Sequence, residues 1–476
     1  MKTLAIHKLG NNKGAPRVYL EGAQLKRAKF DQGKRFEVNV SVENSMVAIR
    51  LADSGSRVVS KKQTGGQEIP VIDINSHQAL SIFEGLASVR VIIKDSEIFI
   101  LPLSTEVKKR RREQSLKQAI ESKVVTVGSL SHGGGVLSHA IHEGLAKSGL
   151  KSKLAFANDI RPELLDQAFV HNDAWDEDTM YLGLPLQELA YDTYAMARLP
   201  EVNIAELGLP CTGASLSGRA KNHLSMAEAH PDVGHLIAPA LAVIARANPA
   251  CIVFENVTQY ANTASMHILR WQLRDMGYVV HETVLEGEDF NCIEHRSRLC
   301  MVAVTEGVDF DFESLVKPLK VSRQLSEIME DVPDNDTNWS PMTYLKDKEI
   351  RDKAAGKGFA MNIVTEKSAY VGTIGKGYSK RRSTEPMIRN KSNPDLLRLL
   401  TIKEHAAVKG IPEKLVIGMG MTIGHELLGQ SIVYDPFVEV GRAVGESLKQ
   451  FSKTPTVNES IIKFQIEPQL DLLAAA

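Results

Sequence analysis

The stretch VVTVGSLSHGGG at residues 124–135, followed by KLAFAND at residues 153–159, decides the fold. The first stretch is a short β-branched run that leads into a glycine-rich turn, and the second is an apolar run that ends in Asp159. Similar runs recur as VNIAELGLP, ACIVFENV, YVVHETV and RLCMVAV, and the segments HLIAPALAVIARAN and MHILRWQLRDMG between them have apolar residues near helical spacing. Strands that alternate with helices predict an α/β domain with a mainly parallel sheet.

Changes in composition along the sequence divide the rest of the chain into predicted segments. Runs such as PRVYLEG, KRFEVNVSV and EIFILPL are short, β-branched and separated by Gly, Asp and Asn, which predicts strands. The stretch VKKRRREQSLKQAIESK consists of helix formers and many charges, which predicts a helical linker. The predicted segments are a β-rich N-terminal module (1–105), a basic helical linker (106–122), a first part of the α/β domain (123–318), an irregular polar region (319–395), a helix-rich second part of the α/β domain (396–452) and a tail (453–476).

The overall composition is typical of a globular protein, with 43% hydrophobic and 24% charged residues and a net charge of −1. No apolar run approaches the roughly 20 residues that a membrane helix needs, and the first residues lack the apolar core of a secretory signal. We therefore expect a cytoplasmic protein without a membrane partner. The spacing of the four cysteines fits neither a zinc site nor a disulfide framework, so no metal is expected.

Basic residues are clustered although the chain is nearly neutral. KKRRR occupies residues 108–112, and a second group lies between Lys376 and Lys391. Such clusters are compatible with a surface that contacts phosphates. A solvated charged face is the alternative, above all for KKRRR.

Residues whose side chains could take part in catalysis follow or end the predicted strands. Cys211 stands in LGLPCTGAS, Glu255 ends IVFEN, and Arg296 and Arg298 stand in EHRSRL. Because ligands of parallel sheets bind at the carboxyl ends of the strands, these groups are expected to lie near one another. A thiol, a carboxyl group and two guanidiniums form a set that can attack an electron-poor ring. Taken singly, each has a simpler explanation: a core cysteine, a helix-capping glutamate and surface arginines.

Four short motifs in this order resemble the DNA cytosine-5 methyltransferases between residues 124 and 450. That family shows Pro-Cys-Gln-x-x-Ser, Glu-Asn-Val, Gln-x-Arg-x-Arg and Gly-Asn-Ser-Val. This chain has PCTGAS at 210–215, ENV at 255–257, EHRSR at 294–298 and GQSI at 429–432. The segment LLTIKEHAAVKGIP resembles a further helix of the family. The resemblance implies a Rossmann-like α/β domain that uses S-adenosyl-L-methionine, with the irregular region 319–395 as a target-recognition domain for a short site in double-stranded DNA.

The resemblance also implies a role for each residue. The Cys211 thiolate would add to C6 of a flipped-out cytosine, Glu255 with a raised pKa would act at N3, and Arg298 and Arg296 would meet O2 and stabilise the thiolate and the pocket wall. Asn256 is expected to fix the Pro210–Cys211 loop. The implied cofactor residues are Gly133, Gly134, Gly135, Asp159 at the ribose, Asp178 at the adenine amine, Pro210, Gln430 and Ser431. The implied residues on the DNA side are Ser215, Asn256, Thr373, Lys376, Lys380, Arg381 and Arg382.

The chain departs from the family pattern at several positions, four of which concern the cofactor loop, the cofactor and the DNA side. Leu130 and His132 replace an aromatic residue and a glycine of the cofactor loop, and Gln430 replaces an asparagine. Glu294 replaces a glutamine and is expected to add a negative charge near the DNA or the rim of the pocket. These departures affect cofactor binding first.

The N-terminal stretch RVYLEGAQLKRAKFDQGKRFEVNV resembles the swapped-hairpin barrels of AbrB-type transcription factors and SymE-like proteins. This likeness implies a module that forms a homodimer or binds DNA, with a scaffold as the alternative. For the whole chain, the first hypothesis is a DNA cytosine-5 methyltransferase. A transfer-RNA cytosine-5 methyltransferase and a DNA-binding regulator that has lost its activity remain alternatives.

Overall fold

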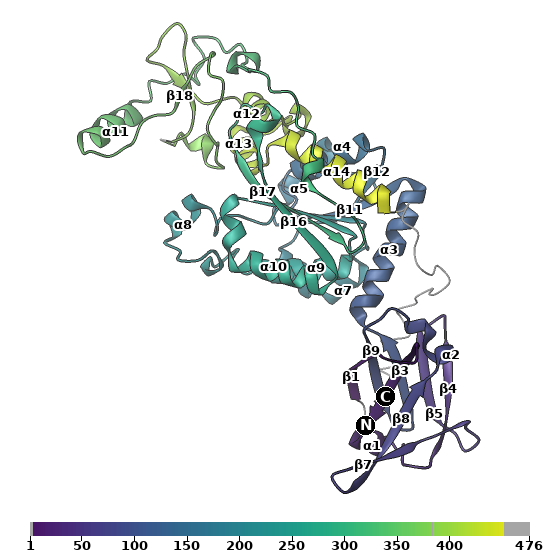
Figure 1. Ribbon diagram of the computed structural model, residues 1–476. Helices are drawn as coiled ribbons and strands as arrows, with labels where there is room; N and C mark the ends of the chain where they lie inside the picture. The colour runs from purple at the N-terminus through teal and green to yellow at the C-terminus, as the bar shows by residue number, and fades with distance from the viewer. Residues whose placement is uncertain (1–2, 383, 452–476) are drawn as a thin grey trace. The chain divides into compact units, whose positions relative to one another are not determined.

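The computed structural model describes residues 3–382 and 384–451, and the chain forms two compact units (Figure 1). The units divide between Arg111 and Arg112, inside helix α3 (Ser104–Ser122). The helix predicted at 106–122 is thus part of α3. Within the described residues, every helix is too short or too polar to span a bilayer. The predicted tail at 453–476 lies outside the described residues.

The N-terminal unit consists of two antiparallel sheets. The six-stranded sheet has, in spatial order, β1 (Thr3–Lys8), β9 (Ser88–Lys94), β10 (Glu97–Pro102), β5 (Met46–Leu51), β4 (Arg35–Ser41) and β6 (Arg57–Val58). The four-stranded sheet has β2 (Gly10–Asn12), β3 (Ala15–Glu21), β8 (Gln67–Asn75) and β7 (Ser60–Thr64). The expectation of a β-rich module is confirmed.

The stretch that resembles AbrB-type modules has the predicted order of strand, helix and strand. It contains β3, the short helix α1 (Ala23–Arg27) and β4. The two strands belong to different sheets, while Val18, Leu25 and Phe36 share one core with helix α2 (His77–Leu80). Dimerisation and DNA binding by this unit stay predictions.

The second unit is built on a seven-stranded sheet. Its spatial order is β13 (Met180–Leu182), β12 (Lys151–Asn158), β11 (Val124–Leu130), β14 (Ile204–Leu207), β15 (Cys251–Asn256), β17 (Ser297–Thr305) and β16 (Tyr278–Glu286). The first five strands are parallel to one another, and β17 and β16 are antiparallel to their neighbours. This is the mainly parallel α/β sheet that the alternating pattern predicts.

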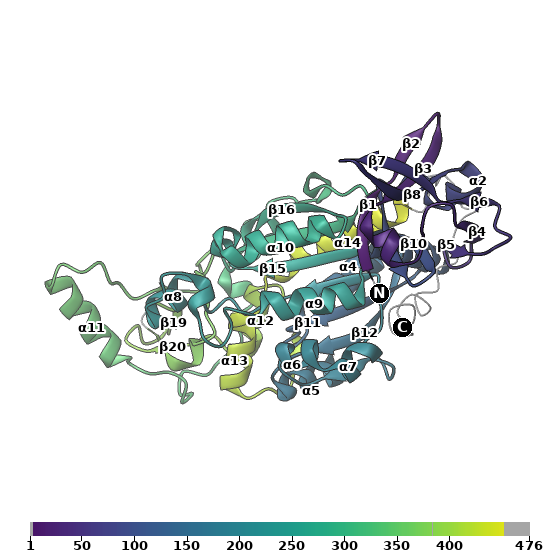
Figure 2. The ribbon, with the colours of Figure 1, turned by 90° about the horizontal axis from the view of Figure 1, so that it is seen from below.

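Helices cover both faces of this sheet, and each face has its own apolar core. One layer includes α4 (Val136–Lys147), α5 (Pro162–His171), α13 (Met421–Gln430) and α14 (Tyr434–Phe451). The other includes α6 (Leu186–Tyr191), α7 (Thr193–Arg198), α9 (Ile237–Ala247) and α10 (Ala264–Asp275), of which α9 and α10 stand in front of the sheet in Figure 2. Helices α4 and α14 approach each other so closely at Gly144 that a side chain there would collide with the Val438 carbonyl. The C-terminal helix thereby completes the α/β domain, as predicted.

The irregular region packs around a small apolar core that includes Ile374, Tyr378 and Ile388 and that it shares with Leu400 and Val408. Around it lie helix α11 (Thr343–Ala354) and a three-stranded sheet of β18 (Ile363–Val364), β19 (Met387–Arg389) and β20 (Leu397–Arg398). The predicted end of this region at residue 395 is too early, because β20 pairs with β19. We call this part the recognition subdomain; α12 (Ile402–Val408) follows it.

Candidate active site

The residues singled out from the sequence gather at the carboxyl edge of the parallel strands. Strand β11 ends at Leu130 before the glycine-rich turn, and β12 ends just before Asp159. The loop after β14 carries Cys211, and Glu255 is the second-last residue of β15. Parallel strands place these ends side by side, so the turn, the thiol and the carboxyl group share one edge of the sheet.

Cys211 is the one partly exposed thiol of the four cysteines, whereas Cys251, Cys292 and Cys300 are buried. Burial raises the pKa of the Cys211 thiol, Arg298 and Arg296 lower it, and Glu255 raises it. The thiol is therefore protonated at neutral pH, while the nearby guanidiniums favour the thiolate that a nucleophile needs. The alternative of a core cysteine fits Cys251 and Cys300 but not Cys211.

Glu255 and Arg298 form an ion pair beside this thiol. Strand β17 pairs with β15, and Glu255 lies opposite Cys300, two residues from Arg298. Because residues two apart project from the same face of a strand, Arg298 and Cys300 share that face, and the Arg298 Nε lies 2.7 Å from the Glu255 Oε1. Burial raises the pKa of Glu255 although Arg298 opposes the shift, and burial lowers the pKa of Arg298 to about 10. A carboxyl group with a raised pKa can carry a proton to a ring nitrogen.

Arg296 has a different environment from Arg298. Its guanidinium is buried and donates hydrogen bonds to the carbonyl groups of Ile374 at 3.0 Å and Gly429 at 2.9 Å. It also donates to Glu294 Oε1 at 3.2 Å. Arg296 therefore joins the sheet to the recognition subdomain and to α13, and its charge reaches the thiol only through space.

The loop between β14 and Cys211 is held in place by Asn256. The Asn256 side chain is buried, and its Nδ2 donates to the Leu209 carbonyl at 3.0 Å while its Oδ1 accepts from the Val257 amide at 2.9 Å. This agrees with the expected role in fixing the loop. Ser215 caps helix α8 (Leu216–Asn222) through a hydrogen bond from the Gly218 amide.

The glycine-rich turn is shaped to hold a ligand and to pack against α13. Gly133 has φ +56°, and a Cβ there would meet no described residue within 4 Å. Its amide donates to Asp159 Oδ2 at 2.7 Å, and the Arg161 amide donates to Oδ1 at 2.9 Å. A Cβ on Gly134 would lie 2.2 Å from the Leu427 Cδ1 of α13, so any larger residue there would displace the Leu427 side chain. The open space beside Gly133 and the carboxyl group of Asp159 fit a cofactor such as S-adenosyl-L-methionine, and the contact of Pro210 with it stays a prediction.

The other implied cofactor residues lie on β13, α13 and α4 or next to them. Asp178 precedes β13, and its neighbour Thr179 donates to the Leu154 carbonyl in the middle of β12. Its contact with adenine stays a prediction. Gln430 is exposed at the end of α13, and the hydroxyl of Ser431 donates to the Leu427 carbonyl. Gly135 is the N-cap residue of α4, with φ +73°.

Five of the residues predicted to face DNA, Thr373, Lys376, Lys380, Arg381 and Arg382, lie on one segment of the recognition subdomain, whereas Ser215 and Asn256 lie at the ends of α8 and β15. Thr373 is exposed and donates to the His295 carbonyl at 2.8 Å, which attaches this segment to the residues before β17. The side chains of Lys376, Lys380, Arg381 and Arg382 are also exposed. Their contact with phosphates stays a prediction.

A cluster of buried polar side chains at the cofactor turn was not predicted from the sequence. It consists of Ser129, His132, Trp175 and Glu206. Trp175 Nε1 donates to His132 Nε2 at 3.2 Å, so the proton of this histidine resides on Nδ1, which lies 2.8 Å from Ser129 Oγ. Burial lowers the pKa of His132 to about 3. Glu206 of β14 lies 4.0 Å from the same Nδ1, and burial raises its pKa to about 7, although Ser138 and Ser129 oppose the shift. A lone glutamate within the apolar run NIAELGLP is the sequence signal that could have revealed this group.

Glu294 does not lie at the rim of the pocket, as predicted, but is fully buried. Its Oε2 lies 2.5 Å from the Nζ of Lys409, which is also fully buried. Lys409 and Arg296 lower the pKa of Glu294 against the effect of burial. The prediction is wrong because the cation that compensates Glu294 comes from a segment more than 100 residues later in the chain.

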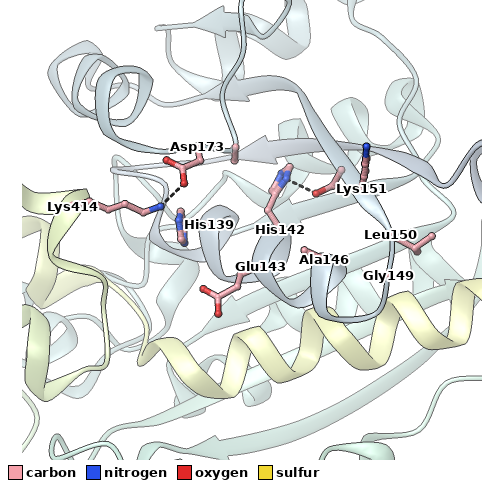
Figure 3. Close-up of a pocket in the computed structure, with 11 residues that line it drawn as sticks. His139, His142, Glu143, Ala146, Gly149, Leu150, Lys151, Asp173 and Lys414 are labelled. Carbon is pink, nitrogen blue, oxygen red and sulfur yellow. Dashed lines mark hydrogen bonds and ion pairs between the residues drawn. The ribbon is translucent and has the colours of Figure 1, made fainter.

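A cavity of about 630 Å³ lies away from these groups, along α4 and at the start of β12 (Figure 3). Its polar walls pair with one another: His142 Nδ1 lies 2.7 Å from Ser152 Oγ, and Lys414 forms an ion pair with Asp173. Lys151 and Ser152 begin β12, whereas Asp159 follows its other end. The cavity is therefore not the active site.

Comparisons with known proteins point to one family. The family model for C-5 cytosine-specific DNA methylase matches residues 187–450. Type II methyltransferase M.NlaX of Neisseria lactamica is 26% identical over 260 residues, which are 53% of this chain and 78% of that protein. Type II methyltransferase M.MspI of Moraxella sp is 26% identical over 278 residues, 57% of this chain and 61% of that protein.

Solved structures show the same fold at lower identity. The S. pombe Dnmt2 methyltransferase superposes with a TM-score of 0.51 at 17% identity, covering 69% of this chain and 99% of that one. The Entamoeba histolytica methyltransferase EhMeth gives a TM-score of 0.51 at 14% identity over 68% of this chain and 98% of that one. The second unit therefore has the Rossmann-like fold expected from the sequence.

Proposed function

The chain belongs to the C-5 cytosine-specific DNA methylase family, and from this premise we propose that it acts as a DNA (cytosine-5-)-methyltransferase on a short site in double-stranded DNA. The observation that carries the proposal is the single accessible thiol, Cys211, beside the ion pair of Glu255 and Arg298 at the carboxyl edge of the sheet. Its named relatives are Type II methyltransferases, which supports a place in a restriction–modification system.

Each group of the site has a defined task in this reaction. The thiolate of Cys211 forms a bond to C6 of cytosine, and the displaced ring electrons are accepted at N3 with a proton or hydrogen bond from Glu255. C5 thereby gains the character of an enamine carbon and becomes nucleophilic. S-adenosyl-L-methionine, when bound, supplies the electrophilic methyl group. A water molecule then accepts the C5 proton, which restores the C5–C6 double bond as the bond between sulfur and C6 breaks and the Cys211 thiolate leaves.

Arg298 supports both groups. It holds Glu255 in place through the 2.7 Å ion pair and favours the thiolate of Cys211 electrostatically. In a water-poor pocket, such fixed charges contribute more than they would in bulk solvent. Because the target atoms of cytosine are inaccessible inside a duplex, the base must rotate out of the stack to reach this site.

The recognition subdomain and the N-terminal unit complete the proposal. The exposed residues Lys376, Lys380, Arg381 and Arg382 contact DNA phosphates, which sets affinity rather than sequence preference. The N-terminal unit supports DNA binding, self-association or both. The protein acts in the cytoplasm.

The test is methylation of plasmid DNA by the purified full chain with labelled S-adenosyl-L-methionine, followed by bisulfite sequencing. We expect methylated cytosines within one short sequence context, and none with Cys211→Ser. Label in transfer RNA but not in DNA, or no label in either, would overturn the proposal.

A further inference from the structure

Glu294 and Lys409 form a buried ion pair that the proposed reaction does not use. Glu294 precedes β17, and Lys409 follows the last residue of α12. Both side chains are fully buried, and the Lys409 Nζ lies 2.5 Å from Glu294 Oε2. An ion pair in such a place does not by itself argue for stability, since apolar residues of the same volume stabilise a core as well or better. The role of the pair is therefore to be sought in the segments that it holds together rather than in its contribution to stability.

The carboxyl group of Glu294 connects the recognition subdomain to the sheet. Its Oε1 accepts a hydrogen bond from the Ile374 amide at 2.8 Å, and the side chain of Ile374 is part of the core of the recognition subdomain. Two backbone hydrogen bonds lie beside it, from the His295 amide to the Val371 carbonyl and from the Val371 amide to the Ile293 carbonyl, each at 2.9 Å. Segment 371–374 is thus attached to residues 293–295 along its length.

The same oxygen also fixes Arg296. Arg296 Nη1 lies 3.2 Å from Glu294 Oε1 and 3.0 Å from the Ile374 carbonyl, and its Nη2 donates to the Gly429 carbonyl. Arg298, which pairs with Glu255, is only two residues away along the chain. A displacement of segment 371–374 would therefore disturb the position of Arg296 and the charges around Cys211.

Lys409 explains why residue 294 is a glutamate in this chain. A glutamine, as in the motif that EHRSR resembles, could also accept the Ile374 amide through its side-chain oxygen. It could not neutralise a fully buried ammonium group, and an unpaired buried charge is strongly unfavourable. The two residues are therefore matched to each other, and replacement of one alone leaves the other in the wrong environment.

We propose that Glu294 and Lys409 are a matched pair of positioning residues that seat the recognition segment 371–374 and Arg296 against the catalytic groups. This inference rests on the proposed methyltransferase function. Through the pair, the placement of target DNA on the recognition subdomain is coupled to the geometry of the pocket around Cys211.

The test compares Glu294→Gln, Lys409→Met and the double variant in the full chain. Methylation rates are measured at varied concentrations of DNA, and bisulfite sequencing of a mixed-sequence plasmid gives the ratio of target to off-target methylation. We expect Glu294→Gln to raise the KM for DNA at least fivefold, to lower kcat and to reduce that ratio. Lys409→Met should have a smaller effect, because the carboxylate keeps Arg296 and the Ile374 amide as partners. The double variant should return both kinetic constants to within threefold of the wild type.

A stability-matched control separates positioning from folding. Val444 of α14 is fully buried in the apolar core that α14 shares with α4. The Val444→Ala variant should lower the Tm without changing the KM for DNA or the ratio of target to off-target methylation. If Glu294→Gln does not fold, the double variant and Lys409→Met still decide the question. A double variant whose loss equals the product of the two single losses would overturn the proposal. So would single variants that lower only the Tm. The wild type in the same assay tests the proposed function separately.

Discussion

Arg298 Nε lies 2.7 Å from Glu255 Oε1, and both residues influence the pKa of the Cys211 thiol in opposite directions. The guanidinium favours the thiolate, the carboxylate disfavours it, and burial outweighs both. The same pair thus holds the carboxyl group in place and sets how readily the thiol ionises. This balance can be tested by chemical labelling without any substrate.

Glu255→Gln should make Cys211 more reactive toward iodoacetamide. Removal of the negative charge lowers the pKa of the thiol, and a change of one unit alters the thiolate fraction up to about tenfold. Arg298→Met should have the opposite effect. The measurement is the alkylation rate at pH 8, with Cys211→Ser as the background because the other cysteines are buried. Equal rates for both variants and the wild type would show that the pair does not act on the thiol.

Asn256→Ala should loosen the loop that carries Cys211. The variant removes the hydrogen bond to the Leu209 carbonyl and leaves that buried group without its partner. Such a loss costs about 1–3 kcal/mol in the free energy of unfolding. We expect a lower Tm and a kcat reduced at least tenfold, with little change in the Kd for DNA. An unchanged kcat in a destabilised variant would mean that the loop does not depend on Asn256.

Glu206→Gln should make the stability of the protein less dependent on pH. Burial raises the pKa of Glu206 to about 7 in the folded chain, so the folded state binds more protons than the unfolded state between about pH 4.5 and 7. The wild type therefore loses stability from this group as the pH rises through that window. The free energy of unfolding of the variant, relative to that of the wild type, should therefore be higher at pH 8 than at pH 4.5, by up to about 3 kcal/mol. Denaturant titration at both pH values measures this difference, and equal differences at both would contradict the assignment.

Replacement of Lys376 and Lys380 by alanine should weaken DNA binding to all sequences alike. If each lysine contacts one phosphate, each loss reduces the slope of log K against log salt by about one. Filter binding at several salt concentrations measures this slope. Lys151→Ala is the matched control, because Lys151 is exposed at the start of β12, at the opposite edge of the sheet. A loss of affinity confined to one sequence would instead indicate contacts to bases.

Six of the seven strands of the large sheet, and the positions of Cys211, Glu255 and Arg298 along the chain, could be predicted because each depends on local patterns. Apolar runs define the strands, and parallel strands bring their carboxyl ends together whatever lies between them. The role of Asn256 follows from the same reasoning, since it ends β15 beside the Cys211 loop.

Other features depend on contacts between distant segments and could not be predicted. The burial of Glu294 requires Lys409, and the environment of His132 requires Trp175 and Glu206. In the N-terminal unit, the polar strand β7 (SKKQT) has no apolar alternation that would mark it as a strand.

The most direct test of the account is covalent trapping on duplex DNA whose target cytosines are replaced by 5-fluorocytosine, in the presence of S-adenosyl-L-methionine. Fluorine at C5 cannot leave as a proton does, so the bond between sulfur and C6 should persist. We predict a complex that survives denaturation and a modified peptide whose DNA adduct maps to Cys211. A fully dissociable complex, or an adduct on any other residue, would contradict the central claim.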